Sequence, residues 1–88
     1  MERTKAEAVI EAVLFAMGES VEIGRLAQVI EEDVKTTNAI LKDMSRRYEE
    51  EDRGIALTQF DNAVQLCTKP DMYEYLIKIA KNPRKPVL

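Results

Sequence analysis

The chain contains no histidine and only one cysteine, Cys67, in its 88 residues. Without histidine it cannot form a Ser-His-Asp or Cys-His catalytic site. A zinc site needs several Cys or His ligands, and one cysteine cannot supply them. A single cysteine also excludes an internal disulfide, which fits a reducing cytoplasm. These absences argue against the commonest nucleophilic and zinc-dependent enzymes.

Glycine is also scarce, and the three glycines, Gly18, Gly24 and Gly54, lie far apart in the sequence. They cannot form a glycine-rich phosphate-binding loop. Carboxylates are plentiful, but they occur in solvated runs such as residues 49–52 rather than as an isolated catalytic pair. We therefore expect no enzymatic activity, no cofactor and no metal.

Long apolar runs are missing as well. None approaches the roughly 20 residues of a membrane span, and the N-terminus leads into a helical pattern rather than a signal peptide. We therefore expect no membrane contact and a cytoplasmic location. The chain is 45% hydrophobic, which is typical of one small globular domain. Its net charge of −3 does not favour a domain whose main task is to bind phosphates.

The most informative pattern spans residues 53–70. Side chains alternate with period two in residues 55–60 and again in residues 64–67, which is the signature of β-strands. Asp61 and Asn62, between these runs, tolerate the positive φ that a tight turn needs. A β-hairpin is therefore predicted.

Three helical patterns precede this hairpin, at about residues 5–17, 23–30 and 34–51, and a fourth begins after it at Pro70. Three helices followed by a hairpin is the order of a winged helix-turn-helix. We predict an α+β, mostly helical fold of this type, with three helices, a β-hairpin wing and a C-terminal fourth helix. Val21 is expected to add a short third strand to the hairpin.

Single residues mark the ends of the predicted helices. Gly18 is expected to end the first helix. Asp33 is a good N-cap for the third helix, because its carboxylate also suits the positive helix N-terminus. Gly54 is expected to end the third helix before the wing.

The first helical pattern is apolar around most of its circumference. Its apolar arc covers roughly 260° at about 100° per residue, and polar residues are reduced to a line through Glu7 and Glu11. A surface helix needs a far narrower apolar face. Two interpretations stay open: the helix is buried on several sides within its own domain, or Ile10, Leu14 and Phe15 meet another molecule.

The fourth helical pattern has an apolar arc of about 200° that includes Tyr73, Tyr75 and Ile79. Tyrosine suits an interface because it buries area while keeping a polar end, but these tyrosines fit the edge of the core equally well. Residues 82–88 contain two prolines and no pattern. We therefore expect a winged-helix domain over residues 1–81, then a linker toward a second domain outside this chain.

A winged helix that reads DNA places its third helix in the major groove and its wing on the backbone. Four residues of the third helix lie on one exposed line and resemble such a contact stripe: Lys35, Asn38, Lys42 and Arg46. Acidic residues surround this line at 31–33, at 49–52 and at the wing tip, Asp61. Like charge near phosphate opposes binding. We therefore interpret the stripe as a solvated face and keep a winged-helix DNA-binding transcriptional regulator as the alternative function.

A further signal comes from several short strings in a fixed order along the chain. They are residues 10–15 with Gly18-Glu19, then Leu26-Ala27, residues 48–57, Gln65-Leu66 and Thr68-Lys69-Pro70. The ordered set resembles the N-terminal domain of segregation and condensation protein B (ScpB), over nearly all 88 residues. Two departures concern turns: this family often has paired glycines and an aromatic residue near Asn62, and often glycine where Glu31 stands here.

The resemblance implies a protein without chemistry of its own. Members of this family are similar to clamps that dimerise through the N-terminal domain and hold the middle segment of the kleisin, ScpA. The kleisin connects them to Smc, and the assembly helps to condense and partition the chromosome in the nucleoid. DNA would then be contacted only indirectly. Any function that needs the family's second winged helix lies outside this chain.

The residue patterns and the resemblance agree that this domain offers surfaces to protein partners. The expected contact residues form two sets: Ile10, Leu14 and Phe15 for a homodimer, and Tyr73, Tyr75 and Ile79 for the kleisin. A generic dimerisation module, with all activity in the absent C-terminal part, stays open as a third interpretation.

Overall fold

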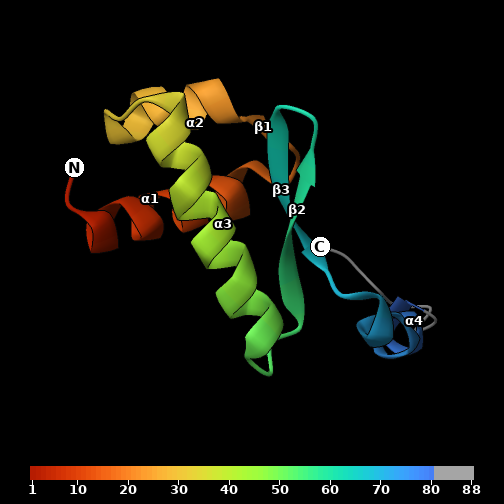
Figure 1. Ribbon diagram of the computed structural model, residues 1–88. Coiled ribbons are helices and arrows are strands. Elements are labelled where there is room, and N and C mark those ends of the chain that lie inside the picture. The colour runs from red at the N-terminus through yellow and green to blue at the C-terminus, as the bar shows by residue number, and fades with distance from the viewer. Residues whose placement is uncertain (81–88) are drawn as a thin grey trace.

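The computed structural model describes residues 1–80, so the linker expected at residues 82–88 lies outside the described part of the chain. Its helices and strands follow the order of a winged helix-turn-helix (Figure 1). In chain order they are α1 (Arg3–Met17), β1 (Val21–Glu22), α2 (Ile23–Ile30), α3 (Val34–Glu50), β2 (Ile55–Phe60), β3 (Ala63–Thr68), the 3₁₀ helix η1 (Pro70–Met72) and α4 (Tyr73–Ala80). The predicted α+β, mostly helical winged-helix fold is confirmed.

Several ends of helices α1 to α3 have residues with identifiable capping roles. Gly18 ends α1 in the left-handed conformation, with φ of 66°, as predicted. Asp33 caps α3, because its side chain accepts a hydrogen bond of 2.7 Å from the Thr36 N–H. Glu31 ends α2 in the left-handed conformation with φ of 61°, which carries a Cβ penalty that glycine would not have.

The end of α3 differs from the prediction. The helix ends at Glu50, because Glu51 already adopts an extended conformation with φ of −94°. Gly54 is therefore not the helix stop. Its carbonyl instead accepts a hydrogen bond of 2.9 Å from the Lys69 N–H, which continues the hairpin pairing past β2 and β3.

The three strands form one antiparallel sheet in the order β1-β3-β2. β2 and β3 pair along their whole length, from Ile55 opposite Thr68 to Phe60 opposite Ala63. The predicted turn lies between them, and Asp61 has the expected positive φ, at 50°. The expected short strand is present, since Val21 in β1 pairs with Val64 in β3.

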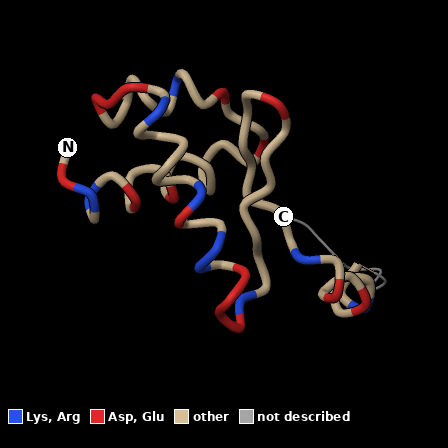
Figure 2. The backbone as a smooth tube through the Cα atoms, in the orientation of Figure 1, with Lys and Arg blue, Asp and Glu red and all other residues tan. Residues whose placement is uncertain are grey.

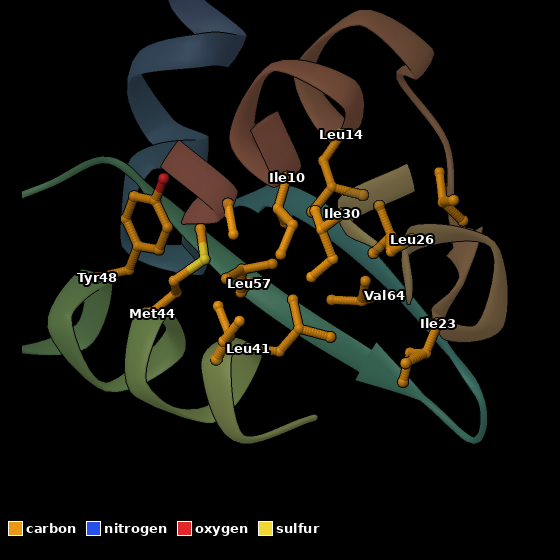
Figure 3. Close-up of a cluster of buried hydrophobic side chains, with 13 residues drawn as sticks. Ile10, Leu14, Ile23, Leu26, Ile30, Leu41, Met44, Tyr48, Leu57 and Val64 are labelled. Atoms are coloured by element: carbon orange, nitrogen blue, oxygen red, sulfur yellow. The ribbon is translucent and has the colours of Figure 1, made fainter. Parts of the chain in front are cut away.

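The core lies between α1, α2, α3 and the inner face of the sheet (Figure 3). Its buried apolar residues come from every one of these elements: Ala6, Ile10, Leu14, Val21, Ile23, Leu26, Ile30, Ile40, Leu41, Met44, Tyr48, Leu57 and Val64. Thr37 is fully buried among them, and its hydroxyl donates to the Asp33 carbonyl at 2.9 Å. We call this unit, from α1 to β3, the body of the domain.

Candidate functional site

Helix α4 is an apolar helix without a covered face. None of its residues is buried, and Figure 1 shows it standing apart from the body. The side chain of Ile79 is 74% exposed, and Tyr73, Tyr75, Leu76 and Ile77 are each about half exposed. We call these five residues the α4 surface. It contains all three residues that the sequence predicts for the kleisin, and none of them lies over the edge of the core.

The three residues predicted for the homodimer are separated by the structure. Ile10 and Leu14 are fully buried, and Figure 3 shows them pointing from α1 toward Ile30 and Val64. Their assignment to a surface is therefore wrong, because the body itself covers them. Phe15 is 80% exposed, since a helix turns by about 100° per residue and carries its side chain away from the core. The homodimer contact stays a prediction that now depends on Phe15.

Charged side chains join α1 to α3 along one side of the body. Arg47 lies 2.8 Å from the Glu7 carboxylate and 3.4 Å from that of Asp43. Arg3 lies 3.1 Å from Glu7 and 3.5 Å from Asp43. The Glu7 carboxylate raises the pKa of Arg47 above its ordinary value. Two acids and two arginines therefore form a partly exposed network of ion pairs across α1 and α3.

Tyr48 connects α3 to both α1 and the end of the wing. Its hydroxyl donates to the Glu11 carboxylate at 2.6 Å, and its backbone carbonyl accepts from the Lys69 ammonium at 2.9 Å. The Arg53 guanidinium lies 5.0 Å from the centre of its ring. Burial, assisted by the bond to Glu11, raises the pKa of Tyr48 to about 12. These contacts fix the segment from which β3 leads into α4.

A cavity of about 210 Å³ opens beside Tyr48, between α1 and α3. The charged side chains that line it, such as Glu7, Arg47 and Arg53, are already engaged in the ion pairs of this region. Among residues 1–80, no group of three or more His, Cys, Asp or Glu side chains could hold a metal ion. No helix within the same range is long and apolar enough to cross a membrane.

The exposed stripe on α3 does not resemble a DNA-binding face once its neighbours are placed. Arg46 pairs with Asp43 and, at 3.5 Å, with Glu50. Within residues 1–80, Lys35 and Lys42 are the charges of the stripe for which no ion pair is found. Figure 2 shows acidic residues at the α2–α3 turn, at the tip of the hairpin and at the C-terminal end of α3. Phosphates approaching this face would meet negative charge on three sides.

Comparison with known proteins identifies the family of this chain. The family described as "Segregation and condensation complex subunit ScpB" matches residues 8–88. The chain belongs to the ScpB family. Segregation and condensation protein B of Lachnoclostridium phytofermentans is 49% identical over 88 residues, which are 100% of this chain and 47% of that protein. The protein of the same name from Agathobacter rectalis is 49% identical over 83 residues, covering 93% and 44% of the two chains.

Two solved ScpB structures share the fold of this family member. One is a dimer of the ScpB N-terminal domain complexed with a ScpA peptide. It has a TM-score of 0.80 and 30% identity, and the match covers 85% of this chain and 94% of that one. The other, ScpB from Mycobacterium tuberculosis, has a TM-score of 0.87 at 22% identity and covers 100% and 56%. The chain spans about half the length of the curated relatives it matches, since the matches cover 47% and 44% of those proteins.

The polar contacts between α1 and α3 could not be predicted from the sequence. The sequence pattern shows Glu7 and Glu11 only as the polar line of the first helix, whereas in the structure Glu7 pairs with Arg47 and Glu11 accepts a hydrogen bond from Tyr48. Glu7 and Glu11 are four residues apart on an otherwise apolar helix, so both lie on one face. This spacing predicts that they contact another element of the fold. The sequence does not say which element that is.

Proposed function

We propose that this chain is the N-terminal winged-helix domain of a non-enzymatic subunit of a bacterial Smc–kleisin complex. It forms a homodimer and binds the kleisin ScpA, which connects it to Smc. The assembly supports chromosome condensation and partition and acts at the nucleoid, in the cytoplasm. A second winged-helix domain follows the linker at residues 82–88 in the whole protein.

The observation that carries this proposal is the α4 surface. A stretch of five large apolar side chains, none of them buried, is unusual for a small monomeric domain and is typical of a binding site for protein. The 30% identical neighbour, of which the match covers 94%, is a dimer complexed with a ScpA peptide. In this proposal the α4 surface binds the kleisin, and Phe15 contributes to the contact between two copies.

Sedimentation velocity tests the proposal directly. The chain is run alone and after mixing with a synthetic peptide covering the middle segment of ScpA from the same organism. We expect a dimer alone and a heavier species with the peptide. Phe15→Glu should shift the chain toward monomer and leave its circular dichroism unchanged, because Phe15 has little contact with the core. A monomer that ignores the peptide would contradict the proposal for this domain.

The DNA-binding alternative is separated by a charge reversal on α3. Lys42→Glu combined with Arg46→Glu should leave peptide binding nearly intact, because these residues lie on the exposed stripe and not on α4. If the chain instead binds duplex DNA, and the double variant abolishes that binding while the peptide has no effect, the protein is a regulator of the alternative class.

A further inference from the structure

The middle strand of the sheet is only partly covered on one of its two edges. β3 pairs with β2 over its full length of six residues, but β1 pairs with β3 only at Ala63 and Val64. On its N-terminal side, β1 is preceded by a bend at Glu19 and by the end of α1 at Gly18. No residue before β1 therefore continues that strand alongside β3. Residues 65–68 of β3 therefore have a neighbour on the β2 side alone among the strands described.

The hydrogen bonds show which peptide groups face this open edge. In an antiparallel pair, alternate residues direct their N–H and C=O groups to opposite edges of a strand. The Lys69 N–H donates to the Gly54 carbonyl at 2.9 Å, so Cys67 and Gln65 also face β2. Leu66 and Thr68 consequently face the β1 side. Within residues 1–80, no group is found that bonds to the N–H or C=O of either.

The opposite edge of the sheet is occupied in a different way. The outward carbonyl of Leu57 in β2 accepts a hydrogen bond of 3.5 Å from the Ser45 hydroxyl, because α3 packs beside β2. An incoming strand would have to displace α3 from this edge. Helix α1 also contacts β3, but within residues 1–80 no hydrogen bond is found to the outward groups of Leu66 and Thr68. The segment of β3 from Leu66 to Thr68 is therefore the better place for a strand to be added.

We propose that an extended peptide of the protein partner adds to β3 as a strand at Leu66 and Thr68, in line with β1. Such an addition supplies hydrogen bonds from backbone to backbone and needs no particular side chain at the paired positions. This inference rests on the proposed function and deepens it, because β3 leads through η1 directly into the α4 surface. One peptide would thus continue from the strand edge onto the apolar helix.

Amide exchange measured by NMR on the chain tests the open edge before any peptide is added. We expect the amides of Gln65 and Cys67 to exchange slowly and those of Leu66 and Thr68 to exchange fast. Addition of the synthetic ScpA middle segment should then slow the exchange of Leu66 and Thr68.

A backbone substitution supplies the matched test. Thr68→Pro removes an N–H that faces the open edge, and proline is tolerated where a strand's N–H does not serve the sheet. It should weaken the peptide complex by about fivefold, which corresponds to one net hydrogen bond. Thr68→Val keeps the N–H and the branched side chain, so its affinity should equal that of the parent chain. Circular dichroism checks that both variants are folded. If Thr68→Pro does not fold, the amide-exchange experiment alone decides whether the peptide adds to β3 as a strand.

The outcomes separate this inference from the proposed function. If the peptide binds while Leu66 and Thr68 still exchange fast, strand addition is wrong and the proposed function stands. If no peptide binds, the proposed function fails for this domain and strand addition fails with it. Slow exchange at these two amides in the free chain would also overturn the inference. In that case a dependence on protein concentration would identify a second copy as the occupant, and independence would mean that the chain itself protects these amides.

Discussion

The body and α4 use the same kinds of side chain in opposite environments. Ile10 on α1 is fully buried, whereas Ile79 on α4 is 74% exposed. Tyr48 lies in the core and bonds to Glu11, whereas Tyr75 is half exposed on α4. Side-chain chemistry therefore does not distinguish a residue that is buried in the core from one that stays exposed on the surface. The distinction comes from whether the fold brings other elements over it.

The largest expected effect separates two adjacent residues of α1. Leu14→Ala should lower the free energy of unfolding by about 2–5 kcal/mol, because it removes a side chain from the centre of the core. Phe15→Ala should change it by less than about 0.5 kcal/mol, since this side chain is mostly in water. Urea denaturation followed by circular dichroism measures both. Equal losses would mean that the two residues share one environment.

On α4 the effect should appear in binding rather than in stability. Tyr75→Ala should weaken the complex with the ScpA peptide by about 1–2 kcal/mol if the ring is an interface anchor. The unfolding free energy of the body should stay the same, because no residue of α4 is buried. Isothermal titration calorimetry gives the affinity. Exposed Val29→Ala on α2 is a matched control away from this surface, and an equal loss of affinity there would remove Tyr75 from the site.

Within the body, a smaller effect is expected where Tyr48 bonds to Glu11. Tyr48→Phe keeps the packed ring and removes one hydrogen bond, so it should cost about 1 kcal/mol of stability. The folded pKa of Tyr48 is raised from 10.0 to about 12. Its contribution is therefore present below pH 10 and lost as the pH rises through about 12. The free energy of unfolding of Tyr48→Phe should therefore fall less steeply between pH 10 and about 12 than that of the parent chain. An equally steep fall would contradict the role given to the Tyr48 hydroxyl.

The smallest effect concerns the cap of α3 at acid pH. Hydrogen bonds from Thr36 hold the pKa of Asp33 below its ordinary value of 3.8. The carboxylate thus adds stability above that value, and the addition is lost as the pH falls through the lower folded pKa. Asp33→Asn keeps a good N-cap without a titrating group. Thermal melts from pH 5 to pH 2 should show a flatter curve for this variant, and a parallel curve would exclude Asp33 as a contributor.

Most of the fold could be predicted because local signals agree with the tertiary structure. The bounds of α2, the cap at Asp33 and the turn at Asp61 follow from spacing and turn chemistry alone. The end of α3 could not be predicted, because Gly54 is used to continue the hairpin rather than to stop the helix. Local sequence offers the same glycine for either purpose.

The candidate site was only half predictable for a similar reason. The apolar arc of α1 is wide, and sequence gives its angular width but not which part of it the other helices cover. Ile10 and Leu14 are covered and Phe15 is not. On α4 the arc and the exposed set coincide, because nothing in the body packs over that helix.

The separation of α4 from the body has a consequence for how much of this protein a cell can tolerate. If the proposed partner covers the α4 surface, copies made in excess of that partner would keep the surface in water, where apolar helices associate with one another without specificity. Synthesis of the subunit and of whatever covers this helix would therefore need to be matched in amount. Gene dosage, rather than folding of the domain, would then set the solubility of the chain.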